Sequence, residues 1–242
     1  IRGGNDLLPQ AFANKLNERI HFDAPVVSIN HDERGVRVTF LESGKQQIIS
    51  GDYIICTIPF SVLKNIEVVP GFSSEKRRAI DELWYTSIAR ISLQTSSRFW
   101  EKENLSGFAH TDLPIMEAWN LSHNVQGTHG MLVAYASGEP ARAIKAMKEP
   151  RRIAFALEHM EKLYPRIRNH FEVGASVCWD EEEWSRGAWA WLKPGQATSV
   201  LPHIARPEGR IFFAGDHTSA WSSWMQGALE SGNRVARTVN DC

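Results

Sequence analysis

The residues with the clearest chemical potential lie near the C-terminus, in the stretch IFFAGDHTSAWSSWMQGALESG that runs from Ile211 to Gly232. It reads as an apolar strand, a Gly-Asp turn, a loop rich in serine and tryptophan, and a helix. Gly215 would let the backbone approach a phosphate or a sugar, and the Asp216 carboxylate would accept hydrogen bonds from ribose-like hydroxyls. Gly-Asp pairs are also common in ordinary turns, and we interpret His217 as a turn or packing residue rather than a base.

The helix predicted over residues 224–239 could stabilise an electron-rich group at its N-terminus. Ser223 at the N-cap and Gln226 at N3 match a capping box, which leaves the first backbone amides free. Gly227 and Gly232 each lower helix propensity by about 1 kcal/mol, so we expect another group to approach closely. A capped core helix with no ligand explains the same pattern. One buried apolar stripe is predicted at positions 224, 225, 228, 229, 235, 236 and 239.

A second candidate region is CWDEEEWSRGAWAWLKPGQ, where Trp179, Trp184, Trp189 and Trp191 fall within thirteen positions. Trp189 and Trp191 are predicted to share one face of a strand. The four indoles fit a hydrophobic core, and they equally fit stacking walls for a planar ring or a sugar. The acidic run 181–183 is predicted to be a solvated turn.

Composition excludes several classes of function. The net charge of −1 gives no general attraction to nucleic acid or to anionic membranes, and the longest apolar run, Tyr53 to Pro59, is too short to span a bilayer. The three cysteines match no metal-binding spacing. No two glycines are separated by a single residue, so a G-x-G-x-x-G phosphate loop is absent. Either no dinucleotide is bound, or that loop lies on a segment before Ile1.

The elements that must position these residues are strands and helices without a clean βαβ alternation, which indicates an α/β (mixed α+β) fold. A helix is expected early in the chain, with Leu8, Phe12 and Leu16 on one face. A β-meander follows it and ends in YIICTIP, which reads as a strand buried on both faces. The remaining expected elements are helices in FSVLKNI and SSEKRRAIDELW, strands in ARISLQTSSRFW, GMLVAYAS, FEVGASVCW and RIFFAG, and helices near 139–147 and 152–163.

Taken in order, the segments RGGNDLLPQAFA, PVVSI, YIICTIP, WDEEEWSRGAWAWLKPGQ and FFAGDHTSAWSSWMQGALESG resemble the flavin-containing amine oxidase family, in particular its L-amino-acid oxidase branch. The resemblance covers the C-terminal half to two-thirds of such an enzyme. It implies a discontinuous, Rossmann-like FAD-binding domain at 1–83 and 205–242, whose phosphate-loop part lies N-terminal to Ile1. It also implies a substrate-binding domain at 84–204, with a mixed sheet flanked by helices.

The resemblance implies a role for each matching residue. Trp189 and Trp224 would form the aromatic cage that aligns the substrate, Ser223 would offer its carbonyl to the substrate amine, and Tyr135 its hydroxyl to the substrate carboxylate. The expected cofactor contacts also include the backbone N–H of Met225, which would bind the flavin C2 carbonyl, and the carboxylate of Asp216, at the ribityl or pyrophosphate region. The backbone of Val26 would contact the adenine end of FAD. The full expected cofactor set is Val26, Trp179, Trp184, Gly215, Asp216, Ser223, Trp224 and Met225.

Two positions depart from the family pattern. Arg90 stands where many relatives have a lysine near flavin N5; it keeps the positive charge but not the geometry of an ammonium group. Ala188 stands where relatives with covalent FAD have a cysteine, so the FAD is expected to be non-covalent. No metal site is expected.

The implied function is oxidative deamination of L-amino acids, with apolar or aromatic side chains favoured, to a 2-oxo acid, ammonia and hydrogen peroxide. Alternatives on the same scaffold are a monoamine or polyamine oxidase and a flavin-dependent amino-acid monooxygenase; a non-catalytic, tryptophan-rich carbohydrate- or peptide-binding module is a different class. The expected partners are an amino acid, dioxygen, the N-terminal segment of the enzyme, in the same or a separate chain, and a second copy in a homodimer. A cytoplasmic or secreted location is expected.

Overall fold

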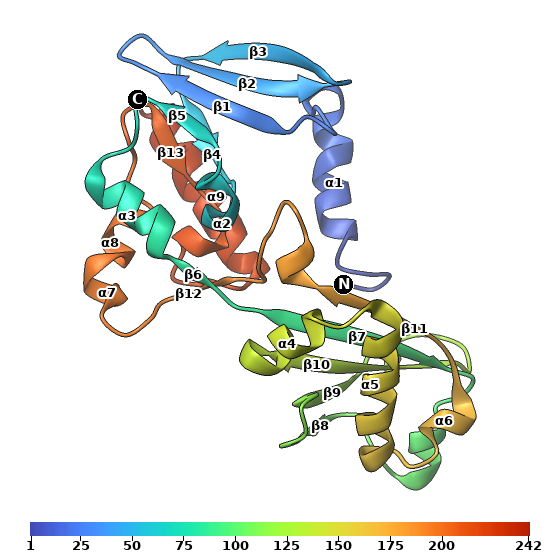
Figure 1. The fold of residues 1–242 in the computed structure, drawn as a ribbon. Coiled ribbons are helices and arrows are strands. Elements are labelled where there is room, and N and C mark those ends of the chain that lie inside the picture. The colour runs from blue at the N-terminus through green and yellow to red at the C-terminus, as the bar shows by residue number, and fades with distance from the viewer. The chain divides into compact units, whose positions relative to one another are not determined.

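The computed structural model describes all 242 residues, and the chain divides into two compact units. Unit 1 comprises residues 1–84 and 192–242, and unit 2 comprises residues 85–191 (Figure 1). The compact units change at 84/85 and 191/192, whereas the expected domain boundaries are 83/84 and 204/205. Residues 192–204 belong to unit 1 because two short helices within them bind α3 (Ser74–Glu82), where Gln196 Nε2 donates to the carbonyl of Glu82 at 2.9 Å.

Unit 1 holds a four-stranded sheet in the order β3-β2-β1-β5 and a separate parallel pair, β13-β4. The meander is confirmed: β1 to β3 are antiparallel neighbours, and β5 joins β1 in parallel. The α1 helix is also confirmed, although none of its residues is buried. The elements of unit 1 are α1 (Leu7–Leu16), η1 (Asn17–Arg19), β1 (Val26–His31), β2 (Val36–Glu42), β3 (Lys45–Gly51), β4 (Ile54–Cys56), α2 (Phe60–Leu63), β5 (Glu67–Val69), α3, α7 (Gln196–Ser199), α8 (Leu201–Ile204), β13 (Ile211–Phe213), η4 (Asp216–Thr218) and α9 (Met225–Asn240).

The strand β4 is less buried than its sequence predicts. Its neighbour β13 is buried throughout, with Phe212 packed against Val235 of α9. Ile55, which pairs with Phe212, stays 40% exposed, so the expectation of burial on both faces is wrong for β4. Helix α9 covers β13 and does not extend the same cover to Ile55.

A buried lysine joins α3 to α8. The side chain of Lys76 is fully buried, and its Nζ donates to the carbonyls of His203 and Ile204, the latter at 2.9 Å. The same Nζ lies 3.9 Å from the centroid of the Phe213 ring. Burial lowers the pKa of Lys76 to about 7, against the opposing effect of the Glu208 carboxylate. A neutral amine keeps two N–H donors, so both carbonyls remain satisfied without a charge.

Because of Lys76, the free energy of unfolding should depend on pH in the neutral to alkaline range. The unfolded chain holds the extra proton up to a pKa of about 10.4, whereas the folded state releases it near 7. The free energy of unfolding should therefore rise with pH between these values, by about 1 kcal/mol per pH unit relative to a Lys76→Met variant. Denaturant unfolding of both proteins at pH 7.5 and 9.5 measures the difference. Equal changes in the two proteins would contradict the prediction.

Unit 2 is built on a five-stranded sheet in the order β11-β7-β10-β9-β8, and all of its named ladders are antiparallel. The mixed character expected from the sequence is limited to one parallel bridge, between Met116 and Tyr135. The elements of unit 2 are β7 (Ile88–Thr95), η2 (Phe99–Glu103), β8 (Ala109–His110), β9 (Glu117–Asn120), β10 (Gly130–Ser137), α4 (Gly138–Lys145), α5 (Glu149–Leu163), α6 (Ile167–His170), β11 (Phe171–Cys178) and η3 (Trp179–Glu181). Two further short strands, β6 (Trp84–Tyr85) and β12 (Ala190–Trp191), pair with each other.

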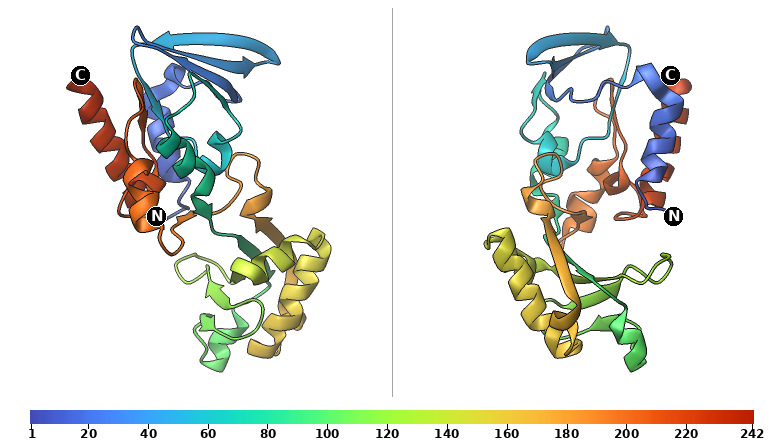
Figure 2. Two further views of the ribbon diagram at one scale, coloured as in Figure 1. Left: turned by 60° about the vertical axis from the view of Figure 1, so that its left-hand side comes forward. Right: turned by 90° about the vertical axis from the view of Figure 1, so that its right-hand side faces the viewer.

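Helices cover one face of the five-stranded sheet, as Figures 1 and 2 show for α5. The core of unit 2 lies between them, with Ala89, Ile91 and Leu93 of β7 packed in the same cluster as Ile144 of α4 and Met160 of α5. Since side chains alternate along a strand, the other face carries Arg90, Ser92 and Gln94. On β7, the face without helices therefore carries polar side chains. None of the helices is both long and apolar enough to cross a membrane.

Candidate active site

The Gly-Asp turn of unit 1 requires glycine at its first position. Gly215 has φ +126°, and a Cβ atom there would lie 2.6 Å from Cε1 of His217. Its N–H donates to Oγ of Ser231 on α9 at 2.9 Å. The turn is thus fixed from the strand side and from the helix side, with no side chain between its backbone and an approaching group.

Asp216 and Ser223 join the two ends of the loop that precedes α9. The Asp216 Oδ2 accepts the Ser223 N–H at 2.9 Å, and Ser223 adopts a left-handed conformation with φ +70°. The predicted capping box is therefore wrong: Trp224, in an extended conformation, is the N-cap, and no side chain caps the helix. Ser223 cannot serve as the cap because its left-handed backbone places it one residue outside the helix.

The N-terminus of α9 presents backbone donors, as predicted. The N–H groups of Gly227 and Ala228 bond to the Trp224 carbonyl, and those of Met225 and Gln226 precede the first intrahelical bonds. With no side-chain cap, these first amides can donate to an electron-rich group, and the helix dipole adds to the effect. The arrangement suits a carbonyl or an anion.

The buried face of α9 differs from the predicted stripe. It consists of Gly227, Ser231 and Val235, whereas Trp224 and Leu229 are 63% and 42% exposed. Small residues form this face because the loop passes close by: a Cβ on Gly227 would lie 2.1 Å from the Trp221 carbonyl oxygen. The expected close approach is confirmed at Gly227. It is wrong at Gly232, where no atom lies within 4 Å of an added Cβ.

His217 is a packing residue, as the sequence suggests. It is 6% exposed, its ring lies 4.9 Å from the ring of Phe60, and its Nε2 is buried without a hydrogen-bond partner. Burial lowers the pKa of His217 to about 4, against the opposing effect of the Asp216 carboxylate. The histidine is therefore neutral at physiological pH and carries one ring N–H.

His217 should make the turn sensitive to acid. Its folded pKa of about 4 lies below its ordinary value of 6.5, so the unfolded state binds more protons between the two. Stability should be complete above pH 6.5 and fall as pH drops toward 4, by about 3 kcal/mol relative to a His217→Gln variant. Thermal unfolding from pH 7 to 4 checks this, and parallel curves for the two proteins would contradict it.

Val26 begins β1 at a break in the ladder. Val26 pairs with Phe40, and the register with β2 then shifts before Ser28. A bulge releases backbone groups from the regular ladder. Such a position suits the backbone contact to adenine that the resemblance implies, and the contact itself stays a prediction.

In unit 2, Arg90, Tyr135 and Glu117 occupy directly paired positions on β7, β10 and β9. Paired residues project to the same face of a sheet, and here it is the face without helices. Arg90 Nε is buried and has no hydrogen-bond partner. A cation and a phenol thus share a face on which a donor still lacks an acceptor, and a carboxylate would supply one.

Two aromatic rings are stacked on this face. The ring centroids of Trp119 and Tyr135 lie 4.3 Å apart, with 13° between the ring planes. Trp119 Nε1 also donates a hydrogen bond to Glu117 Oε2 at 2.7 Å. Burial raises the pKa of Tyr135, the Glu117 carboxylate raises it further, and Arg90 opposes both. Tyr135 therefore stays protonated and can donate a hydrogen bond. Sequence reasoning missed Trp119 and Glu117, because only the strand register places them beside Tyr135.

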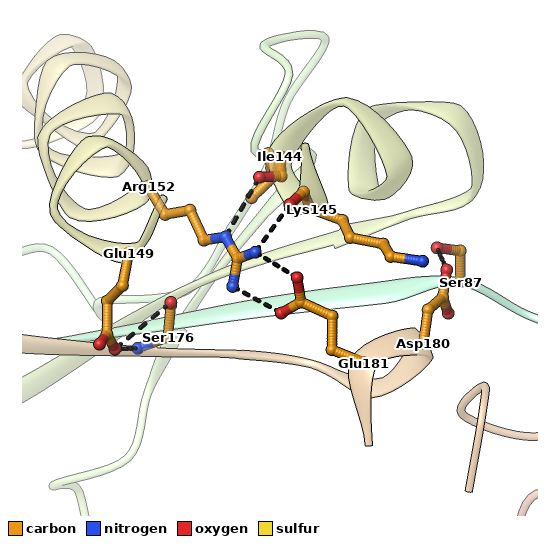
Figure 3. Close-up of polar contacts among 8 residues, drawn as sticks. All are labelled: Ser87, Ile144, Lys145, Glu149, Arg152, Ser176, Asp180 and Glu181. Atoms are coloured by element: carbon orange, nitrogen blue, oxygen red, sulfur yellow. Dashed lines mark hydrogen bonds and ion pairs between the residues drawn. The ribbon is translucent and has the colours of Figure 1, made fainter. Parts of the chain in front are cut away.

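Trp179 lies on η3, which Figure 3 shows held by two polar contacts. Arg152 of α5 donates from Nη1 and Nη2 to both carboxylate oxygens of Glu181, at 2.9 and 2.7 Å (Figure 3). The Ser87 hydroxyl donates to Asp180 Oδ2 at 2.5 Å. Glu181 is exposed, as predicted for the run 181–183, and the structure adds an ion pair to the buried Arg152 guanidinium that the sequence did not show. Trp179 itself is 39% exposed.

The other tryptophans of this region do not form a core. Trp184 and Trp191 are 58% and 59% exposed, and Trp189 is half-buried. Trp189 is fixed by its backbone, since its carbonyl accepts the Thr86 N–H at 2.8 Å. The core interpretation is wrong for this cluster, and the interpretation as stacking surfaces remains.

The predicted site residues thus form two sets. Unit 1 positions the loop and helix mouth, and unit 2 positions the sheet face and η3. Residues in the first set are Val26, Gly215, Asp216, Ser223, Trp224 and Met225, and in the second Arg90, Tyr135, Trp179, Trp184 and Trp189. Unit 1 offers a turn that excludes a Cβ and a helix with uncapped amides, and unit 2 offers exposed indole faces. Both kinds of feature suit a planar, electron-rich cofactor. The residues present therefore fit a flavin.

The comparisons with known proteins agree with this assignment. Residues 1–240 match the family model described as flavin containing amine oxidoreductase. YobN of Bacillus subtilis (strain 168), whose name makes it provisionally an L-amino-acid oxidase, is 38% identical over 99% of this chain and 52% of its own length. The flavin-dependent L-tryptophan oxidase RebO of Lentzea aerocolonigenes is 30% identical over the same shares. Wild-type putrescine oxidase bound to putrescine superposes with a TM-score of 0.88 at 23% identity, over 99% of this chain and 53% of that one.

The chain belongs to the flavin-containing amine oxidoreductase family. It has the mixed α/β fold of that family, and the family cofactor is FAD. It spans about half the length of the curated relatives that it matches.

Proposed function

We propose that this chain supplies the substrate face and part of the FAD site of an L-amino-acid oxidase. The observation that supports the choice of substrate is the pairing of Arg90 with Tyr135 on the open face of the unit 2 sheet. A buried, unpartnered guanidinium donor next to a protonated phenol suits a carboxylate, which a simple amine lacks. The names of the relatives from Bacillus subtilis and Lentzea aerocolonigenes support the same substrate class.

The protein's own residues orient the substrate. The Tyr135 hydroxyl donates to the substrate carboxylate, and the Ser223 carbonyl accepts from the substrate amine. Trp189 and Trp224 are the walls that exclude water and favour apolar or aromatic side chains. Arg90 keeps a positive charge near the reacting centre.

FAD, when bound, would supply the redox chemistry, which is uptake of a hydride from the substrate α-carbon and, with dioxygen, formation of hydrogen peroxide. The residues that would hold it are Val26, Trp179, Trp184, Gly215, Asp216, Ser223, Trp224 and Met225. The uncapped amides of α9, including that of Met225, would stabilise negative charge on the bound flavin. The imino acid product hydrolyses to a 2-oxo acid and ammonia. Ala188 provides no thiol for a covalent link, so the FAD is non-covalent.

An amine or polyamine oxidase is the second candidate. Wild-type putrescine oxidase, in a structure with putrescine bound, shares the fold. An amino-acid monooxygenase is the third candidate; its products would be carbon dioxide and an amide. We further propose that the N-terminal segment of the enzyme completes the site, that the enzyme is a homodimer, and that it is cytoplasmic or secreted.

Product analysis separates these candidates. The holoenzyme is supplied with a panel of L-amino acids and their decarboxylated amines, and peroxide, ammonia, carbon dioxide and amide are measured. We expect peroxide and ammonia from apolar or aromatic L-amino acids. Peroxide from amines alone would overturn the proposal, as would an amide product. The absence of absorption bands near about 450 nm from the purified enzyme would overturn the flavin assignment altogether.

A further inference from the structure

Tyr135 cannot by itself fix the direction of its hydroxyl. A phenol on an open sheet face can rotate about its side-chain torsions unless a neighbour restrains it. The restraint here is the Trp119 indole, which lies flat on the Tyr135 ring at 4.3 Å. Trp119 is offset from Tyr135 by two residues on the neighbouring strand, since it pairs with Val133 and Tyr135 pairs with Glu117. The stack is therefore a diagonal cross-strand contact, which sheet register keeps in place.

The indole is in turn restrained by a charged partner. Trp119 Nε1 donates to Glu117 Oε2 at 2.7 Å, and both residues lie on β9 on the same face of the sheet. Glu117 pairs directly with Tyr135 in the ladder, so its carboxylate lies on the same face of the sheet as the indole and the phenol. A hydrogen bond to a carboxylate is stronger than one between neutral groups. The two β9 residues form a bracket for the Tyr135 ring.

We propose that Trp119 and Glu117 are positioning residues that hold the Tyr135 ring and so set the affinity for the substrate carboxylate. They act through Tyr135 and touch neither the reacting carbon nor the cofactor. The inference rests on the proposed function, because it concerns the carboxylate that distinguishes an amino acid from an amine. Its consequence is selective: loss of the bracket weakens binding of amino acids and leaves binding of amines unchanged.

Four variants of the holoenzyme test the bracket. Trp119→Leu removes both the stack and the donor, whereas Trp119→Phe keeps a stacking ring and guards against failure to fold. Glu117→Leu removes the acceptor, whereas Glu117→Gln keeps a carbonyl oxygen that can accept from the indole. The matched reference is Tyr135→Phe, which keeps the ring and removes the hydroxyl. KM and kcat are measured for an L-amino acid and for its decarboxylated amine.

We expect Trp119→Leu and Glu117→Leu to raise KM for the amino acid about tenfold, with kcat and KM for the amine within about twofold of wild type. Trp119→Phe and Glu117→Gln should stay within about threefold for both substrates. In the Tyr135→Phe background, Trp119→Leu should have no further effect, because contacting residues with one role couple in a double-mutant cycle.

Two results would overturn this inference and leave the proposed function standing. One is equal loss for amino acid and amine, which indicates a purely structural role. The other is an undiminished effect of Trp119→Leu in the Tyr135→Phe background. A wild-type enzyme that oxidises only amines would overturn the proposed function and this inference together. The wild-type substrate profile therefore distinguishes the two kinds of failure.

Discussion

Replacement of Gly215 by alanine is expected to remove FAD from the enzyme and to destabilise unit 1. The added Cβ would lie 2.6 Å from Cε1 and 2.7 Å from Nδ1 of His217, whose ring is buried against Phe60. Alanine at φ +126° also adopts a strained backbone conformation. Together these effects should cost about 2–4 kcal/mol and open the turn that faces the cofactor. Flavin content and thermal unfolding of the purified protein measure both consequences.

The matched control is Gly232→Ala in the same C-terminal segment. Gly232 lies within α9, and an added Cβ meets no atom within 4 Å. Alanine is the better helix former by about 1 kcal/mol, so this variant should be neutral or more stable. If Gly215→Ala retained wild-type flavin content and stability, the turn would have no role as a close-approach site.

Replacement of Arg152 by leucine is expected to be the most damaging single change in unit 2. Arg152 is 7% exposed and binds Glu181 through two hydrogen bonds. It also donates to the carbonyls of Ile144 and Lys145, the last residues of α4 (Figure 3). The change leaves these acceptors unpaired. We expect the free energy of unfolding to fall by about 2–4 kcal/mol. This is less than for a fully buried ion pair, because Glu181 is partly exposed.

The same change should affect Trp179, which precedes Asp180 and Glu181 on η3. Without the guanidinium, η3 is anchored only by its contact to Ser87 and by its own backbone. We expect a several-fold rise in the Kd for FAD alongside the loss of stability. Arg168→Leu is the control, because the Arg168–Glu161 pair is exposed on both sides and should contribute less than about 1 kcal/mol. Equal losses in the two variants would contradict a special role for Arg152.

Local pattern was sufficient to predict most elements. The meander from β1 to β3 follows from alternating residues and from turns rich in glycine and charge, which leave few other conformations. The long strands β7 and β10 have enough alternation to show which face is buried. The site residues were predicted through the family resemblance. Their types and spacing alone left a core helix and a tryptophan core open.

The failures share a physical cause, which is that tertiary contacts decide the outcome. Ser223 has the side chain of an N-cap, but the bond from its N–H to Asp216 holds it outside α9. The buried face of α9 contains Gly227 because a loop carbonyl must pass there, which an apolar periodicity cannot show. Arg152 and Glu181 are 29 positions apart, and no local pattern pairs them. The stack of Trp119 on Tyr135 depends on sheet register in the same way.

In the proposed function, the enzyme recognises an amino acid through its carboxylate. The most direct measurement is kcat/KM of the holoenzyme for L-phenylalanine and for phenethylamine, in the wild type and in Tyr135→Phe. We expect the wild-type kcat/KM to be about 100-fold or more higher for the amino acid than for the amine, equivalent to about 3 kcal/mol of transition-state stabilisation. In Tyr135→Phe this ratio should fall about tenfold. A kcat/KM for the amine that equals or exceeds that for the amino acid would contradict the claim.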